Sequence, residues 1–316
     1  MTASSCKTST GESVLGTAQL LQRHPENPIL RPRDEIPWER KAVFNPGVVE
    51  HEGRIYLLYR AVGEYELYIS RLGLAVSEDG VHFKRHPEPV FSPREPYERF
   101  GCEDPRITSL EGRYYVTYTA LSARAFSGQG NRVALASTVD FQHFERHGVI
   151  LPELEDKDAV IFPEKVRDKY VMFHRVFPDI WISYSNDLLH WYGHRKVMYP
   201  RLGHWDSEKI GAGAPPIKTE EGWLLFYHGV DATHRYSIGV ALFDLDDPSQ
   251  LISRPVEPLL EPVAEYERNG DIPNVVFVCG VVKRDEEFLV YYGGGDKVIC
   301  LASAPVQEVV DFARHG

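Results

Sequence analysis

The chain has 316 residues, of which 43% are hydrophobic and 26% charged, as in an ordinary globular protein. Its formal net charge of −11, without any basic run, argues against nucleic acid or an anionic membrane as a partner. No stretch approaches the roughly 18 apolar residues of a membrane-spanning helix. Residues 1–19 lack the basic and apolar regions of a secretory signal, so we expect a cytoplasmic protein.

Cofactor and metal motifs are missing from the sequence. The four cysteines, Cys6, Cys102, Cys279 and Cys300, form no CxxC pair, and we expect free thiols. The 13 histidines include no HExxH or comparable spacing, and no GxGxxG or Walker loop occurs. We therefore expect neither a bound metal ion nor a cofactor.

A repeat of about five units organises the chain from residue 27 onward, after an expected N-terminal extension of residues 1–26. Short apolar, Tyr-rich runs occupy residues 55–59 (IYLLY), 114–118 (YYVTY), 170–174 (YVMFH), 223–227 (WLLFY) and 288–292 (FLVYY). A second apolar strand follows each run, at residues 72–77, 133–137, 180–185, 238–242 and 298–303. In three units this strand leads into a polar turn closed by an aromatic residue, namely Phe83, Phe144 or Trp191.

A proline-containing dipeptide precedes each Tyr-rich run. These dipeptides are Asn45-Pro46, Asp104-Pro105, Phe162-Pro163, Pro215-Pro216 and Pro273-Asn274. Because proline is tolerated at the first residue of a strand, we expect each dipeptide to begin one. Each unit then consists of a strand, a hairpin, a strand and two further extended pieces.

Five four-stranded units predict an all-β fold, a five-bladed β-propeller over residues 27–305 with short terminal extensions. Radial closure would remove the exposed sheet edges of an open array. A β-sandwich with coincidental spacing is the alternative. Residues 306–316 form a C-terminal tail whose residues 306–313 are compatible with a helix.

The innermost strands of a propeller converge on its axis, so polar residues beside the repeated prolines should surround one mouth of a central channel. The residues in question are Asn45, Glu103, Asp104, Arg106, Glu164, Lys165, residues 211–213 and Asn274. Polar residues at the ends of the Tyr-rich strands can reach the same place, namely Arg60, His174, Arg175, His228 and Asp296. Carboxylates, arginines and a lysine gathered at one mouth indicate a binding site.

Glycoside cleavage requires a carboxylic acid for the leaving oxygen and a nucleophile on the opposite face of the sugar. Asp104 is the candidate acid, although it could equally be a turn residue paired with Arg106. A hydrolase needs a second carboxylate, whereas a phosphorylase needs a cationic cradle for phosphate. Such a cradle could come from Lys165, Arg175, His228 and Arg124. Each of these could instead neutralise a neighbour, Arg124 above all, because it lies in the Gly/Ser-rich segment 122–130.

Seven ordered motifs between residues 27 and 303 resemble glycoside hydrolase family 130, which holds β-mannoside phosphorylases and a smaller group of β-mannosidases. They are residues 45–47 (NPG), 101–106 (GCEDPR), 162–165 (FPEK), 174–175 (HR), 211–216 (GAGAPP), 222–229 (GWLLFYHG) and 291–296 (YYGGGD). The last of these departs from the family's usual YYGAAD. The two extra glycines loosen the strand end that carries Asp296.

The resemblance implies a five-bladed propeller and an inverting reaction, in which a β-mannoside and inorganic phosphate, as co-substrate, give α-mannose 1-phosphate. It implies that Asp104 is the acid, acting through the mannosyl 3-hydroxyl. It assigns Asn45, Arg60 and Asp296 to the mannosyl site, where we also place Glu103. Lys165, Arg175 and His228 correspond to phosphate-binding positions.

Two other functions stay open. A β-mannosidase that uses water would lose the cationic cradle and need a carboxylate opposite Asp104, for which Glu164 and Asp158 are candidates. A catalytically silent sugar-binding propeller would lose the acid or the mannose contacts, and none is lost. The linkage (β-1,2 or β-1,4) and the acceptor depend on loops 61–70 and 121–131. Assembly into a homo-oligomer is compatible with the sequence, but no feature identifies an interface.

Overall fold

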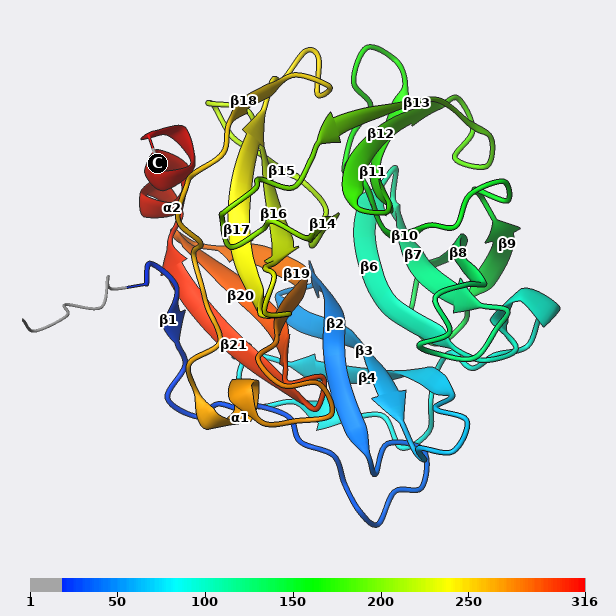
Figure 1. Ribbon diagram of the computed structural model, residues 1–316. Helices are drawn as coiled ribbons and strands as arrows, with labels where there is room; N and C mark the ends of the chain where they lie inside the picture. The colour runs from blue at the N-terminus through cyan, green and yellow to red at the C-terminus, as the bar shows by residue number, and fades with distance from the viewer. Residues whose placement is uncertain (1–18, 316) are drawn as a thin grey trace, which may run out of the picture.

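The computed structural model describes residues 19–315, in which five antiparallel sheets surround a central axis (Figure 1). Blade 1 contains β2 (Ala42–His51), β3 (Arg54–Val62), β4 (Ser70–Ser77) and β5 (Lys84–Arg85). Blade 2 contains β6 (Cys102–Leu110), β7 (Arg113–Leu121), β8 (Asn131–Thr138) and β9 (Glu145–Val149). Blade 3 contains β10 (Lys157–Ile161), β11 (Tyr170–Val176), β12 (Asp179–Ser185) and β13 (Trp191–Met198).

Two further blades and three short helices complete the part of the chain that the structure describes. Blade 4 contains β14 (Lys209–Ala212), β15 (Ile217–Lys218), β16 (Trp223–Val230), β17 (Tyr236–Phe243) and β18 (Leu251–Ser253). Blade 5 contains β19 (Val276–Arg284), β20 (Glu287–Gly294), β21 (Val298–Pro305) and β1 (Gln22–Arg23). The helices are η1 (Pro96–Glu98), α1 (Glu265–Arg268) and α2 (Val306–His315). The predicted five-bladed propeller is confirmed, and each Tyr-rich run lies in the second strand of its blade.

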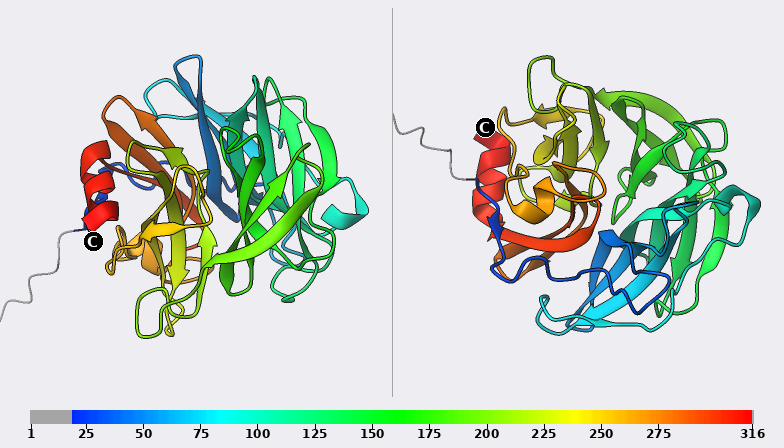
Figure 2. Two further views of the ribbon diagram at one scale, coloured as in Figure 1. Left: turned by 90° about the horizontal axis from the view of Figure 1, so that it is seen from above. Right: turned by 60° about the horizontal axis from the view of Figure 1, so that its bottom comes forward.

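The N-terminal strand β1 closes the ring. Gln22 and Arg23 pair with Ser303 and Ala302 of β21, so strands from both ends of the chain share blade 5 (Figure 2). The propeller therefore begins before residue 27, inside the segment expected to be an extension. Helix α2, which forms the expected C-terminal tail, buries Val309, Val310 and Ala313 against this last blade and blade 4.

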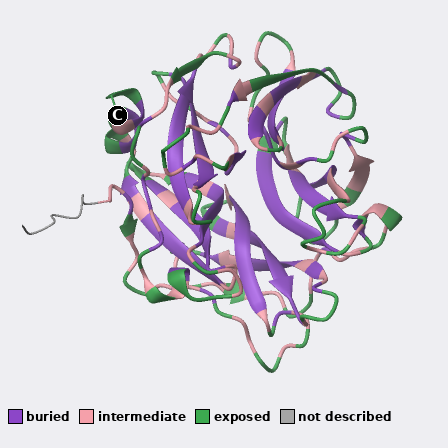
Figure 3. Cartoon of the chain, viewed as in Figure 1, coloured by how far each residue is buried: buried purple, intermediate pink, exposed green. Residues whose placement is uncertain are grey.

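Hydrophobic cores lie between neighbouring blades rather than inside any one sheet. Between blades 3 and 4, for example, Phe162 packs edge to face on Phe173 and on Trp223, with ring centroids 4.9 Å apart in both pairs. Buried residues follow the strands all round the ring, while exposed ones gather in the peripheral loops (Figure 3). Cys102, Cys279 and Cys300 are buried free thiols, and Cys6 lies outside the described residues. Within residues 19–315, no helix is both long and apolar enough to cross a bilayer.

A bulge recurs in the innermost strands of the first three blades. The strand register shifts at Asn45, Asp104 and Asp158, whose φ angles are 48°, 49° and 55°. Asn and Asp tolerate this left-handed conformation better than other non-glycine residues, and a bulge re-aims the side chain it carries. Pro46 and Pro105 follow within the strands, so the expectation that they begin a strand is wrong. At a bulge, the missing N–H of proline disturbs no regular ladder bond.

The fifth residue of every Tyr-rich run contacts a buried carboxylate. These pairs are Tyr59–Glu39 at 2.6 Å, Tyr118–Glu98 at 2.5 Å, His174–Asp156 at 2.5 Å, Tyr227–Asp206 at 2.9 Å and Tyr292–Glu267 at 2.8 Å. In four blades an arginine completes the cluster, namely Arg85, Arg146, Arg254 or Arg23. A buried charge is tolerable only when it is paired and hydrogen-bonded in this way. The five clusters therefore attach the middle strand of each blade to its neighbouring loops.

Blade 3 departs from this pattern at three positions. The strand register places Ser183 where the other blades carry Ala75, Ala136, Ala241 and Ala302. Ser183 Oγ lies 2.7 Å from His174 Nε2 and 2.7 Å from His194 Nδ1. Two histidines and a serine thus replace the tyrosine, alanine and arginine of the other blades, next to a carboxylate that faces the axis.

Candidate active site

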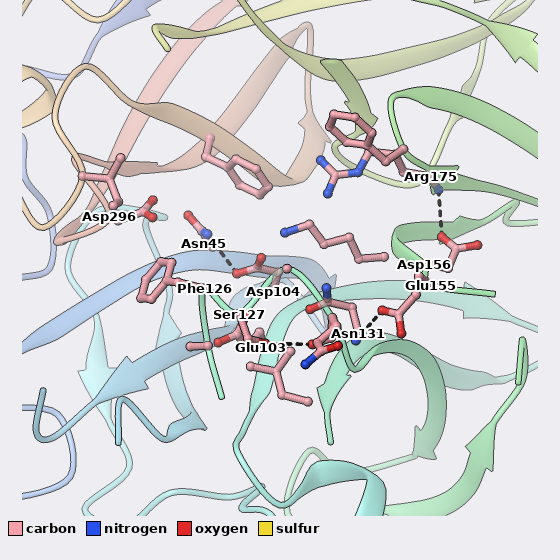
Figure 4. Close-up of a pocket in the computed structure, with 18 of the residues that line it drawn as sticks. Asn45, Glu103, Asp104, Phe126, Ser127, Asn131, Glu155, Asp156, Arg175 and Asp296 are labelled. Atoms are coloured by element: carbon pink, nitrogen blue, oxygen red, sulfur yellow. Dashed lines mark hydrogen bonds between the residues drawn. The ribbon is translucent and has the colours of Figure 1, made fainter. Parts of the chain in front are cut away.

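A cavity of about 470 Å³ opens at the axis, and all five blades contribute to its wall. Its charged and amide residues include Asn45, Arg60, Glu103, Asp104, Arg124, Asp156, Lys157, Arg175, Lys209 and Asp296. Asn45, Asp104 and Asp296 lie on one side and Arg175 and Asp156 on the other (Figure 4). Seven of the nine residues predicted from the sequence line this cavity, while Lys165 and His228 do not.

Asp104 presents one oxygen to the cavity because its other oxygen is occupied. Its Oδ1 accepts hydrogen bonds from Asn45 Nδ2 at 2.9 Å and from Arg60 Nη1 at 3.2 Å. No hydrogen bond from residues 19–315 reaches Oδ2. The bulges of two adjacent blades bring Asn45 and Asp104 together, so the backbone fixes the orientation of this carboxyl group.

Arg60 also binds two further residues on the acidic side of the cavity. Its Nη2 donates to Glu103 Oε1 at 2.5 Å and its Nε to Ser70 Oγ at 2.9 Å. Its guanidinium lies 4.5 Å from the ring centroid of Phe44, a cation–π contact. Burial raises the pKa of Glu103, Arg60 opposes that rise, and Asp104 adds to it. A single guanidinium thus serves two adjacent carboxyl groups.

Asp296 is the third carboxyl group of this side, and its backbone is also left-handed, with φ 49°. Burial raises the pKa of Asp296 to about 7, with Arg60 lowering it and Asp104 raising it. We call Glu103, Asp104 and Asp296 the carboxyl cluster. Burial and the nearby charge of Asp104 therefore favour the protonated form of Asp296.

Asp158 organises the opposite side from behind the cavity wall. Its Oδ1 lies 3.0 Å from Arg106 Nη2 and its Oδ2 lies 3.1 Å from Arg175 Nη1. Burial alone would raise the pKa of Asp158, but Arg175 and Arg106 hold that pKa well below its ordinary value. Asp158 is therefore a paired anion that orients Arg175 and is not free to deprotonate water.

Arg175 is fixed at two points. Its backbone N donates to Asp156 Oδ1 at 3.0 Å, and its guanidinium pairs with Asp158. His228 lies behind it, with Nε2 3.6 Å from Asp158 Oδ2 and its ring 4.2 Å from the Phe277 ring centroid. Burial lowers the pKa of His228 well below its usual range, against the opposing effect of Asp158. His228 is thus a neutral support rather than part of the cavity surface.

Lys165 is, after His228, the second predicted phosphate ligand that does not line the cavity. Its Nζ lies 3.0 Å from Glu111 Oε1 and 4.4 Å from the Tyr170 ring centroid, outside the cavity wall. Its expected place at the channel mouth rests on aligning Pro163 with Pro46 and Pro105. The strand register instead aligns Asp158-Ala159 with those dipeptides and Lys157 with Glu103.

Two lysines that the sequence analysis missed occupy the cavity instead. Lys157 and Lys209 join Arg175 in a cationic wall, as we call these three residues. Burial, together with the charges of Arg175 and Lys157, lowers the pKa of Lys209 to about 8. Lys157 could have been identified from the sequence, because it directly precedes Asp158, the bulge residue that corresponds to Asn45 and Asp104. No motif marks Lys209.

The other sequence candidates are placed as follows. Arg124 lines the cavity from the loop between β7 and β8. Glu164 pairs with Lys218 at 2.5 Å on the exposed outer side, so it does not face Asp104. Within residues 19–315, no group of three His, Cys, Asp or Glu residues is arranged to hold a metal ion.

The fold and cavity define a β-propeller that combines a carboxyl cluster with a cationic wall at its axis. The chain belongs to glycoside hydrolase family 130, because the profile described as beta-1,4-mannooligosaccharide phosphorylase matches residues 20–315. The family resemblance of the sequence motifs is thereby confirmed.

Known proteins of this family resemble the chain over most of its length. A 1,2-beta-oligomannan phosphorylase from Thermoanaerobacter sp. (strain X514) is 45% identical over 92% of this chain and 98% of its own. The structure of a beta-1,2-mannobiose phosphorylase from Listeria innocua, in complex with beta-1,2-mannobiose, superposes with a TM-score of 0.85 and 32% identity, covering 94% and 99% of the two chains. A structure reported for family glycoside hydrolases that target beta-1,2 mannosidic linkages in Candida mannan has a TM-score of 0.83 and 30% identity, covering 92% and 94%.

The raised pKa of Asp296 predicts a pH effect on stability. Between about pH 4 and about pH 7 the folded chain keeps a proton on Asp296 that the unfolded chain has lost, so the free energy of unfolding falls as pH rises. Asp296→Asn should therefore gain thermal stability relative to the wild type across this interval. Thermal unfolding midpoints at several pH values would measure the difference. Asp246→Asn, in an exposed loop, is the control, and parallel curves for wild type and Asp296→Asn would contradict the prediction.

Proposed function

We propose that this protein is a β-mannoside phosphorylase that transfers a mannosyl unit to inorganic phosphate with inversion, giving α-mannose 1-phosphate and a shortened acceptor. The observation that carries the proposal is the cationic wall facing the carboxyl cluster across one cavity. Phosphate arrives as an anion and needs positive charge rather than a general base. Phosphate as co-substrate also suits a cytoplasmic enzyme, and no cofactor is required.

In this proposal the mannosyl unit lies against Asn45, Arg60 and Asp296, with phosphate on Lys157, Arg175 and Lys209. A phosphate oxygen attacks the anomeric carbon while the bond to the glycosidic oxygen breaks on the opposite face. The departing oxygen takes a proton that originates on Asp104, directly or through the mannosyl 3-hydroxyl. Hydrogen phosphate gives up one proton on becoming a phosphate monoester, and that proton restores the acid.

The geometry favours phosphate over water as the nucleophile. A hydrolase that inverts needs a carboxylate free to activate water opposite the acid. Asp158 is neutralised by two arginines, and Glu164 is paired with Lys218 outside the cavity. Asp156 has both oxygens occupied, by His174 and by the backbone N of Arg175. The linkage we propose is β-1,2, because the 45%-identical relative and the superposed Listeria structure both carry that linkage in their names.

Phosphate dependence is the decisive test of the function. Purified protein is incubated with β-1,2-mannobiose and with β-1,4-mannobiose, with and without millimolar phosphate, and the sugar products are identified. We expect α-mannose 1-phosphate only when phosphate is present, and from β-1,2-mannobiose. Free mannose released at the same rate without phosphate would instead establish a β-mannosidase.

Asp104→Asn should lower kcat by at least the 10²- to 10⁴-fold that a general acid typically contributes. The amide cannot supply the proton, yet it can still accept the bonds from Asn45 and Arg60 at the same oxygen position. Mannobiose binding, measured by calorimetry, should therefore persist. Near-normal turnover by this variant would rule out Asp104 as the acid.

Two lysine variants separate the cationic wall from the position first predicted. Lys209→Ala should raise the KM for phosphate about tenfold or more, because a hydrogen bond between charged groups contributes about 1.5–3 kcal/mol. Its KM for the mannoside should change much less. Lys165→Ala is the matched control and should leave both constants near their wild-type values. Equal effects of the two variants on phosphate would refute the assignment to the cationic wall.

A further inference from the structure

A second hollow of about 360 Å³ adjoins the axial cavity on its acidic side. Tyr65, Tyr68 and Phe126, which we call the aromatic shelf, line it together with Asp271 and Ile272. Phe126 and Ile272 also line the axial cavity, so the two spaces are continuous. Phe126 lies near Asn45 and Asp296 and away from Arg175 (Figure 4). The shelf is thus reached from the carboxyl cluster and not from the cationic wall.

Two of the three shelf rings are open to solvent, although large aromatic side chains are normally covered. Phe126 is 71% exposed and Tyr65 is 48% exposed. Phe126 also has a left-handed backbone, with φ 63°, which is uncommon for a bulky residue. Such strain persists where the surroundings enforce it and is often found at ligand sites. An exposed, strained ring at the mouth of a polar cavity is consistent with a contact surface for a ligand.

Polar contacts hold the shelf in place. Tyr65 Oη donates to Asp271 Oδ1 at 2.8 Å, and Lys297 Nζ lies 2.9 Å from the same oxygen. Tyr65 and Tyr68 stack with ring centroids 6.0 Å apart and an interplanar angle of 15°, and Tyr68 meets Phe126 at 5.1 Å. The rings are therefore preorganised, and Asp271 and Lys297 supply hydrogen-bonding groups at their edge. A pyranose ring, with an apolar C–H face and a rim of hydroxyl groups, matches both features.

The direction of the proposed reaction identifies which part of the substrate would reach the shelf. In an inverting displacement the nucleophile and the leaving group occupy opposite faces of the sugar. With phosphate on the cationic wall, the leaving oligosaccharide extends toward the acidic side, where the shelf begins. We propose that the aromatic shelf binds sugar units of the leaving chain beyond the cleaved bond, and that the enzyme therefore prefers β-mannan oligosaccharides longer than the disaccharide. This inference rests on the proposed phosphorylase function.

The test compares kcat/KM for phosphorolysis of a mannobiose and of the mannotetraose of the same linkage, whichever linkage the enzyme cleaves. We expect a higher value for the tetraose in the wild type. Tyr65→Ala and Phe126→Ala should each reduce the tetraose-to-biose ratio about three- to tenfold, the range expected when an aromatic contact is lost. Tyr65→Phe retains the ring and should keep most of the ratio.

Tyr199→Ala is the matched control, because Tyr199 is an exposed aromatic residue that lines neither space. Its tetraose-to-biose ratio should equal that of the wild type. A wild-type ratio of one, or a ratio unchanged in both shelf variants, would overturn the shelf while leaving phosphorolysis established. Failure of every mannoside to react with phosphate would instead overturn the proposed function itself.

Discussion

The arrangement of the active site depends on Arg106, whose guanidinium is buried where three blades meet. Its Nη1 donates to the Asp104 carbonyl oxygen at 2.8 Å in blade 2, and its Nη2 lies 3.0 Å from Asp158 Oδ1 in blade 3. Its Nε and Nη2 donate to the carbonyl oxygens of Gly213 and Ala212, at the end of the inner strand of blade 4. Only a planar group with several fixed donors can satisfy these acceptors together, so lysine could not replace it. Arg106, two residues after the candidate acid, therefore fixes the acidic side of the cavity relative to the cationic side.

The same backbone bulge carries residues with three different chemical roles in successive blades. The same left-handed bulge directs Asn45, Asp104 and Asp158 toward the axis. Asn45 is a neutral donor to Asp104, Asp104 keeps an oxygen free, and Asp158 is fully neutralised by arginines. The neighbouring residues decide these differences, because the backbone geometry is nearly the same in each case. A symmetric fold thereby produces an asymmetric site without any change in its framework.

The fold can be predicted from the sequence more completely than the active site can. The Tyr-rich runs identify the second strand of all five blades because each carries the local signals of a strand. Strand β1 escapes notice because two residues carry no pattern and its partner lies at the other end of the chain. The acidic side is predictable since Asn45 and Asp104 share a bulge and a following proline. The cationic side is not predictable in this way, because alanine rather than proline follows Asp158 and no repeated motif marks Lys209. Searching for the repeated proline therefore selects Pro163 and, beside it, Lys165.

The pairing of β1 with β21 links the order of synthesis to the completion of folding. The strand at residues 22–23 leaves the ribosome long before its partner at residues 298–305. Four blades can assemble from local hairpins, while the fifth must wait for a contact spanning almost the entire sequence, which is entropically slow. Until β1 pairs, the outer edge of β21 is open to pairing with another chain. The ring can therefore close only after residues 298–305 have been synthesised.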